Sequence, residues 1–278
     1  MTINPVLHRE FLLRMRWRSD RPLVITVAIL VLLLVVFVYY LLIQWAVYSP
    51  GASTGSSIWM TCTIIQFIII SFFGPISAAN AITREKEQQT WDTLVLTPLK
   101  PIEIVFGKLL ARLLPIAAFV LLFTPGAIYG MLLSLGDVNG GRVTLLKFTL
   151  SSAVILVCLL FFTCSSLFIS SKMKRSIYSV MLNYVWVIGF LMMGTALISG
   201  AIASVVSTPG FMEKSPLLWI NPVYLITVAV SWDATGWASF SGEGAVGLFW
   251  GLITYVLISL FMIWRLTANF NNFAYDND

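Results

Sequence analysis

The sequence predicts an all-α polytopic membrane protein, because it has too little charge for a soluble surface and its apolar residues fall in long runs. Of its 278 residues, 59% are hydrophobic and 10% are charged, whereas a typical globular domain is about 45–50% apolar and about 25% charged. The mean hydropathy is +0.91. Lipid must therefore be the solvent for most of the chain, which excludes a soluble enzyme, a secreted disulfide scaffold and a disordered protein.

Six apolar runs are long enough to cross a bilayer. An apolar helix of about 20 residues spans the hydrocarbon core of roughly 30 Å. The runs are Leu23–Val47, Ile58–Ile82, Leu109–Leu133, Leu145–Ile169, Ile177–Ile202 and Ala245–Trp264. The first is too long for the apolar part of a signal peptide, so we interpret it as an uncleaved anchor. We expect the whole chain, residues 1–278, to form a single transmembrane domain.

The distribution of Lys and Arg predicts the orientation of these spans. With six spans, one side of the membrane holds 14 of these residues: Arg9, Arg14, Arg16, Arg18, Arg21, Arg84, Lys86, Lys100, Lys108, Arg112, Lys172, Lys174, Arg175 and Arg265. The other side holds Arg142, Lys147 and Lys214. Because cytoplasmic connections carry the excess of Lys and Arg, both termini are predicted to lie in the cytoplasm.

The N-terminal segment, residues 1–22, is predicted to be an interfacial helix. Its core, Asn4–Asp20, places Leu7, Phe11 and Met15 in one stripe. The basic residues beside the apolar stripes are Arg9, Arg14, Arg16 and Arg18. Long arginine stems can reach from such a helix to lipid headgroups. A helix floating on anionic lipid and a helix that contacts a partner both remain open.

The cytoplasmic connection 83–108 is predicted to contain a short helix. Arg84–Gln89 is polar and helix-favouring, and an apolar face follows at Trp91 and Leu94. Pro98 ends this helix, and Pro101, with a glutamate two residues later, suits the first turn of the next one. Without further information, a plain solvated connection is the alternative.

The outer connection 203–244 contains a second apolar run, Leu217–Ser231, which is interrupted at Asn221-Pro222. Fifteen residues with an internal proline are too few to span comfortably. We expect a re-entrant or interfacial helical hairpin before the last span, because a break exposed to lipid would leave backbone groups without partners.

The residue inventory offers no catalytic or metal site. The interiors of the six spans hold no Asp, Glu, Lys or Arg, and the single histidine, His8, precedes the first span. Cys62, Cys158 and Cys164 are scattered in apolar runs, so no zinc ligand set is available. No GxxxxGK[ST] or GxGxxG motif is present, so the chain cannot bind nucleotide phosphates by those devices, and any energy that it uses must come from another chain. We therefore expect a non-catalytic chain without a cofactor or metal of its own, and no nucleic-acid partner.

Small and polar residues within the spans indicate helix packing. Gly126–Gly130 and Gly247–Gly251 form GxxxG steps, which let helix backbones approach closely, and packing within the chain is the favoured interpretation. The uncharged polar residues in or near spans are Gln44, Gln66, Asn80 and Asn183. Each could line a pathway or donate a hydrogen bond to a neighbouring helix.

The stretch Ile82–Lys108 resembles the signature of type-2 ABC export permeases. The matching positions are Glu87, Gln89-Thr90, Asp92, Leu94, Thr97-Pro98 and Gly107-Lys108. The opening Asn4-Pro5-Val6-Leu7 with Arg9-Glu10, the Asn221-Pro222 step and the six-span order are also similar to that family. Gln89 stands where glycine is commoner.

The resemblance implies a membrane subunit that pairs with a second permease half, identical or different, and with cytoplasmic ABC ATPases that bind ATP and Mg²⁺. It implies that Glu85–Leu96 is a coupling helix seated on the ATPase. The coupling residues would be Glu85, Glu87, Gln89, Thr90, Trp91, Asp92, Leu94, Thr97 and Pro98. It also implies a bacterial-type inner cell membrane and outward transport.

A path without buried charge suits an amphipathic, lipid-like or drug-like substrate better than a bare ion. The alternatives are a secondary transporter or channel, an intramembrane enzyme and a non-transporting membrane scaffold. Of these four interpretations, only the ABC permease requires a stoichiometric soluble ATPase.

Overall fold

The computed structural model describes residues 22–48, 54–90, 100–135, 143–206, 216–231 and 243–270, and every regular element in these ranges is a helix. The longer helices are α2 (Pro22–Tyr48), α3 (Thr54–Ala79), α6 (Pro101–Ser134), α7 (Leu145–Lys172) and α13 (Glu243–Ala268). The shorter ones are α4 (Thr83–Glu87), α8 (Ser176–Tyr184), the π-helix η1 (Val185–Gly194), α9 (Thr195–Val206), α11 (Pro216–Trp219) and α12 (Pro222–Ser231). The all-α prediction is confirmed.

Five helical segments among the described residues are long and apolar enough to cross a membrane: Thr54–Glu87, Pro101–Ser134, Leu145–Lys172, Ser176–Ile202 and Val246–Ala268. They coincide with the second to sixth predicted runs. The first predicted run lies in α2, a helix of 27 residues. The count of six spans stays a prediction.

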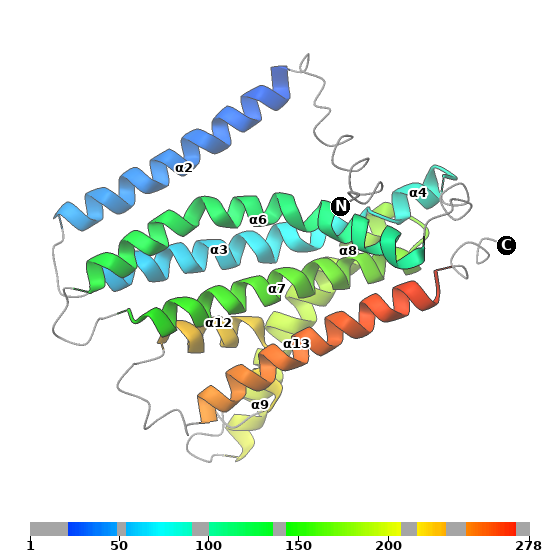
Figure 1. Cartoon of the computed structure of the whole chain (residues 1–278). Coiled ribbons are helices and arrows are strands. Elements are labelled where there is room, and N and C mark those ends of the chain that lie inside the picture. Colours follow the sequence, from blue (N-terminus) through cyan, green and yellow to red (C-terminus); the bar gives the residue numbers. More distant parts are fainter. Residues whose placement is uncertain are drawn as a thin grey trace.

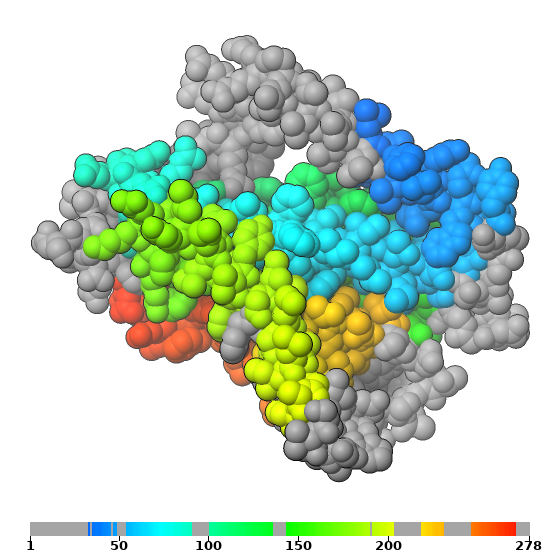
Figure 2. Space-filling view, turned by 180° about the vertical axis from the view of Figure 1, so that it is seen from behind, coloured from blue at the N-terminus to red at the C-terminus, as the bar shows by residue number. Residues whose placement is uncertain are grey.

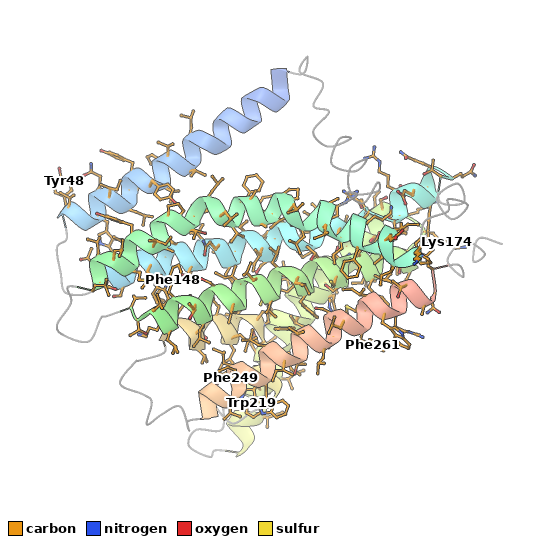
Figure 3. All side chains as sticks on the ribbon, in the orientation of Figure 1. Tyr48, Phe148, Lys174, Trp219, Phe249 and Phe261 are labelled. Atoms are coloured by element: carbon orange, nitrogen blue, oxygen red, sulfur yellow. The ribbon has the colours of Figure 1, made fainter. Side chains whose placement is uncertain are left out.

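Helices α3, α6 and α7 run along one another, and α7 lies between α3 and α13 (Figure 1). Helix α4, the start of α6, the turn between α7 and α8 and the last residues of α13 lie at one end of the bundle, which we call the α4 end. Lys174 lies at the α4 end and Tyr48 at the opposite end (Figure 3). Of the ten Lys and Arg in the described ranges, Lys147 alone lies at the opposite end. This arrangement reproduces the charge asymmetry that was used to orient the spans.

Helices α3 and α6 approach so closely that glycines are required between them. A Cβ added to Gly130 would lie 2.5 Å from the Trp59 backbone nitrogen and 2.9 Å from the Gly55 carbonyl oxygen. A Cβ on Gly126 would lie 2.8 Å from Cys62 Sγ. The first predicted GxxxG step therefore packs α6 against α3 within the chain, as expected.

The second GxxxG step lies on α13 and receives the segment before α12. A Cβ on Gly247 would lie 2.5 Å from the Trp219 ring, and one on Gly251 would lie 2.4 Å from the Trp219 carbonyl oxygen. Trp219 lies near the beginning of α13 in Figure 3. Both GxxxG steps thus serve packing within this chain.

The fifth predicted span is a helix of changing geometry. It runs as α8, then ten residues of π-helix in η1, then α9. The sequence predicts a membrane-spanning helix over Ile177–Ile202, and the structure adds that ten of its residues are π-helical. Figure 2 shows this composite helix crossing the face of the molecule beside α3 and α12. Where η1 passes α12, the Met192 carbonyl oxygen accepts a hydrogen bond from Asn221 Nδ2 at 3.0 Å.

Substitution of Gly130 tests the close approach of α3 and α6. Gly130→Ala should destabilise the fold by about 1–3 kcal/mol, because backbone atoms on α3 cannot move aside for the added methyl group. The matched control is Gly200→Ala, since a Cβ at Gly200 meets nothing within 4 Å. Thermal unfolding of the two purified variants in the same detergent measures the difference. Equal midpoints would contradict the packing described.

Candidate functional site

The polar side chains of the α4 end converge on helix α4, which follows α3 after a turn at Asn80–Ile82. Three consecutive residues of α4, Glu85, Lys86 and Glu87, bond to three different helices. We call this set of contacts the α4 latch.

Helix α4 ends abruptly because its C-terminus forms a complete capping motif. The Thr90 N–H donates to the Glu85 carbonyl oxygen at 2.9 Å, and the Gln89 N–H donates to the Lys86 carbonyl oxygen at 3.1 Å. These bonds define a Schellman motif, which requires a left-handed residue at Gln89. Gln89 indeed has φ of 55°.

The continuous helix predicted over Glu85–Leu96 is therefore wrong at its centre, because α4 stops at Glu87. Glutamine is a good helix former by propensity, so propensity alone does not predict a helix end at this position. Gln89 stands at the position where the family that this sequence resembles commonly carries glycine. Glycine adopts positive φ at no steric cost.

Glu85 links α4 to α6 through an ion pair with Lys108. The Lys108 side chain is 1% exposed and that of Glu85 is 20% exposed. Lys108 Nζ also donates to the Ala81 carbonyl oxygen at 3.2 Å. A buried ammonium is costly unless it is paired and hydrogen-bonded, so this lysine fixes the first turns of α6 to the chain just before α4.

Lys86 links α4 to the end of α7. Its Nζ donates to the Ser171 carbonyl oxygen at 2.6 Å. The last carbonyl groups of a helix have no partners within the helix and carry partial negative charge. A lysine ammonium is therefore well placed at this terminus.

Glu87 links α4 to the start of α8. The Ser176 N–H donates to Glu87 Oε1 at 2.6 Å, and Ser176 Oγ donates to Oε2 at 2.8 Å. These two hydrogen bonds hold the pKa of the exposed Glu87 carboxyl below its ordinary value. Because the folded-state pKa is lowered, ionised Glu87 stabilises this contact at neutral pH, and the stabilisation is lost as the pH falls through that pKa.

The beginning of α4 is held by α7. Ser170 Oγ accepts hydrogen bonds from the Ile82 and Thr83 N–H groups, both at 3.1 Å. Ile82 provides no side-chain cap of its own, so a serine from another helix performs that task. Ser170 and Thr83 are fully buried, which leaves these N–H groups no access to water as an alternative.

Together these contacts attach one short helix to α6, α7 and α8, while α3 leads directly into it. A displacement of α4 must therefore move these helices with it or break its contacts with them, of which the Ser170 hydrogen bonds are buried and the Glu87–Ser176 hydrogen bonds are exposed. The geometry is suited to transmitting a movement between the α4 end and the spans.

Comparison with known proteins identifies the family. The family described as "ABC-2 family transporter protein" matches residues 15–191, more than half of the chain. The chain belongs to the ABC-2 transporter family. No curated protein sequence matches it. The matched region begins before α2, ends within η1 and includes α4 with all of its partners.

Membership makes the chain the permease, the membrane-spanning part of an ABC transporter. The family also implies association with an ABC ATPase. The polar connection between α3 and α6 is thus the part of the permease where such an association was expected.

The structure describes four of the nine predicted coupling residues. Glu85 and Glu87 form the contacts above, Gln89 is the left-handed residue, and Thr90 closes the Schellman motif. Trp91, Asp92, Leu94, Thr97 and Pro98 lie outside the described residues, as do Arg9, Arg14, Arg16 and Arg18 of the predicted interfacial helix.

Asn221 and Pro222 form a break whose polar groups have partners within the permease. Asn221 Oδ1 accepts from the Val223 N–H at 2.8 Å and so caps α12, while its Nδ2 donates to Thr195 Oγ1 at 2.9 Å. The Tyr255 hydroxyl donates to the Ile220 carbonyl oxygen. This satisfies the requirement that was stated for a hairpin at membrane depth. The re-entrant path itself stays a prediction.

Sequence reasoning missed three residues of the latch, Lys86, Ser171 and Ser176, and it also missed Ser170, which holds the beginning of α4. Lys86 was counted only as a topological charge, and the serines end or begin helices without any distinguishing pattern. Lys108 was recognised only as a topological charge and as part of the Gly-Lys step. Its position one residue after Gly107, on the buried side of α6, was the available signal.

Substitution of Gln89 tests the Schellman motif in the permease. Gln89→Gly should stabilise the protein by about 0.5–1 kcal/mol, because glycine adopts positive φ without the steric cost that glutamine bears. Gln88→Gly is the matched control and should be neutral or destabilising, since Gln88 has φ of −87°. Thermal unfolding in detergent measures both. A loss of stability in Gln89→Gly would contradict the assigned cap.

Proposed function

We propose that the chain is the membrane-spanning permease subunit of an ATP-driven ABC exporter. In this proposal the ATPase binds ATP and Mg²⁺, and the connection Thr83–Lys108 receives its movement. A second permease half, identical or different, completes the transporter. The observation that carries the proposal is the α4 latch, which joins the connection to three further helices.

The burial of the latch contacts indicates how a movement of the ATPase would pass through α4 to the other helices. Lys108 is buried, and pulling it away from Glu85 would leave its ammonium group without a counter-charge in an apolar surrounding, which is costly. By contrast, Gln88, Gln89 and Thr90 are exposed. Movement of the partner should therefore be passed on to α6, α7 and α8 as a tilt of helices rather than absorbed within α4.

The proposed setting is a bacterial-type inner membrane with both chain ends in the cytoplasm. The support is the charge distribution, in which nine of the ten described Lys and Arg lie at the α4 end. Cytoplasmic connections carry such an excess. The Arg-rich segment before α2 would then lie along the inner surface, beside the ATPase.

The proposed cargo is amphipathic, lipid-like or drug-like. The support is the weakly polar character of the spans: their polar side chains are mainly Ser, Thr, Gln and Asn, which bond to backbone carbonyls. Charged groups at membrane depth mark the pathways of ions and protons. The buried Lys108 lies at the α4 end and is neutralised by Glu85.

Co-purification tests the proposal. The double variant Trp91→Asp, Leu94→Asp should lose the soluble ATPase that accompanies the wild-type permease, with binding weakened about thirtyfold, because truncated apolar anchors commonly cost about 2 kcal/mol or more. Gln88→Asp adds a charge to the same connection at an exposed position and should keep the ATPase. Membrane insertion of all variants is checked by fractionation.

Two results would contradict the proposal. If the double variant retained the ATPase at wild-type yield, Trp91 and Leu94 would not be its anchors. If the wild-type chain, purified in mild detergent from its native membrane, carried no ATPase at all, a secondary transporter or a membrane scaffold would replace the exporter.

A further inference from the structure

A cavity of about 160 Å³ lies between α3, α6 and α7, away from the α4 latch. The polar residues that line it are Thr63 and Gln66 from α3, Thr124 from α6, and Ser151 and Ser152 from α7. Phe148, also in the lining, is on the first turns of α7 (Figure 3). Ser, Thr and Gln are common where membrane helices pack together, and here five of them lie around one cavity.

The hydroxyl and amide donors of this lining already have acceptors within the helices, whereas Trp59 Nε1, also in the lining, has no hydrogen-bond partner. Thr63 Oγ1 donates to the Trp59 carbonyl oxygen at 2.8 Å, and Ser152 Oγ donates to the Phe148 carbonyl oxygen at 2.8 Å. Ser151 and Thr124 donate to backbone carbonyls in the same way, at 3.0 and 3.3 Å. Each hydroxyl keeps lone pairs after its single proton is used.

The Gln66 amide follows the same rule. Its Nε2 donates to the Val120 carbonyl oxygen at 3.0 Å and to Thr124 Oγ1 at 3.3 Å, which leaves the carbonyl oxygen of the amide as an acceptor. Gln66 is 6% exposed. The polar part of the lining is therefore rich in hydrogen-bond acceptors and carries no ionised side chain.

One side of the cavity meets the apolar surface of the bundle. Leu121 on α6 and Leu156 on α7 both line the cavity, and they are 65% and 58% exposed. Exposed leucines on spans of this kind face lipid tails. A molecule can therefore enter from the bilayer with its chain along these leucines and its head among the acceptors.

We propose that this cavity binds a single-chain amphiphile whose uncharged polar head donates hydrogen bonds, such as a long-chain alcohol. A carboxylate head would meet acceptors with Trp59 Nε1 as the one donor without a partner in this lining, and no cationic side chain there would offset its charge. An ammonium head would lose its hydration without gaining a counter-charge from the lining. The binding needs no ATPase, and only the further statement that the amphiphile is cargo rests on the proposed function.

Photolabelling of the full-length chain in phosphatidylcholine vesicles, without ATPase, tests the proposal. The probe is dodecanol with a diazirine in its chain, and the matched control probe is its methyl ether, which cannot donate a hydrogen bond. Both are dosed as mole fractions in the bilayer. We expect saturable labelling of the segments 120–127 and 148–156, with half-saturation at a mole fraction about fivefold lower for the alcohol than for the ether.

Three variants locate the acceptors. Thr63→Val and Ser152→Ala should each raise the half-saturating fraction of the alcohol about three- to fivefold and leave that of the ether unchanged. Thr63→Ser keeps the hydroxyl and should bind as the wild type does. The matched control is Thr254→Val on α13, where the hydroxyl likewise donates to a backbone carbonyl, that of Trp250 at 2.7 Å, but lies outside the cavity.

Equal half-saturation by the alcohol and the ether would overturn the proposal, since the cavity would then be an apolar crevice only. Labelling that rises linearly without saturating, or tighter binding of diazirine-labelled dodecanoate than of the alcohol, would overturn it as well. Three- to fivefold weaker binding of the alcohol by Thr63→Val, together with binding at the wild-type level by Thr63→Ser, supports it, because both variants retain the packing of α3. None of these outcomes depends on whether an ATPase co-purifies, so failure here is distinct from failure of the proposed function.

Discussion

The pairing of Lys108 with Glu85 is the interaction on which the α4 end depends. A lysine ammonium with 1% exposure is tolerated only where a carboxylate and a carbonyl oxygen replace its water, because the desolvation cost of a buried ion is several kcal/mol. This requirement places Glu85, and with it all of α4, against the first turns of α6. Once α4 is there, Lys86 reaches the end of α7 and Glu87 reaches the start of α8.

The rest of the bundle provides the rigidity that makes this arrangement useful. Glycine contacts bring the backbones of α3 and α6 together at Gly126 and Gly130, and the Phe161 and Tyr255 rings join α7 to α13 with centroids 4.5 Å apart. Tyr255 in turn binds the carbonyl group at the break before α12. A displacement applied at α4 therefore meets packed helices rather than loose ones, and interiors of native packing density transmit strain.

The sequence predicted the spans well because the thickness of the bilayer dictates the length of an apolar run. It also predicted that α6 begins at Pro101, where the Lys100 N–H donates to the Glu103 carboxylate at 3.2 Å. The predicted start of that span, Leu109, lies two turns later because hydropathy detects only the part of a helix that is in lipid. Helix α6 has 34 residues, about 50 Å, and so exceeds the hydrocarbon core.

The sequence could not predict the π-segment or the latch. Val185–Gly194 is apolar throughout, so no periodicity distinguishes a π-helix from an α-helix there. The latch joins residues that are far apart in the chain, such as Glu87 and Ser176, and common residue types carry it. The end of α4 depends on backbone hydrogen bonds that force Gln89 into a conformation against its propensity. Such features are properties of tertiary structure.

The most direct measurement of the central claim is a double-mutant cycle on Glu85 and Lys108, by unfolding in mixed micelles. Glu85→Gln should cost the most, about 2 kcal/mol or more, because it leaves the buried ammonium without the Glu85 carboxylate. Lys108→Met should cost less, since a freed Glu85 is partly exposed to water. The double variant should be about as stable as Lys108→Met alone, which corresponds to a coupling energy of about 2 kcal/mol. If the free-energy costs of the two single variants simply added in the double variant, the coupling energy would be zero. That result would contradict the account, because the ion pair would then not stabilise the position of α4 against α6.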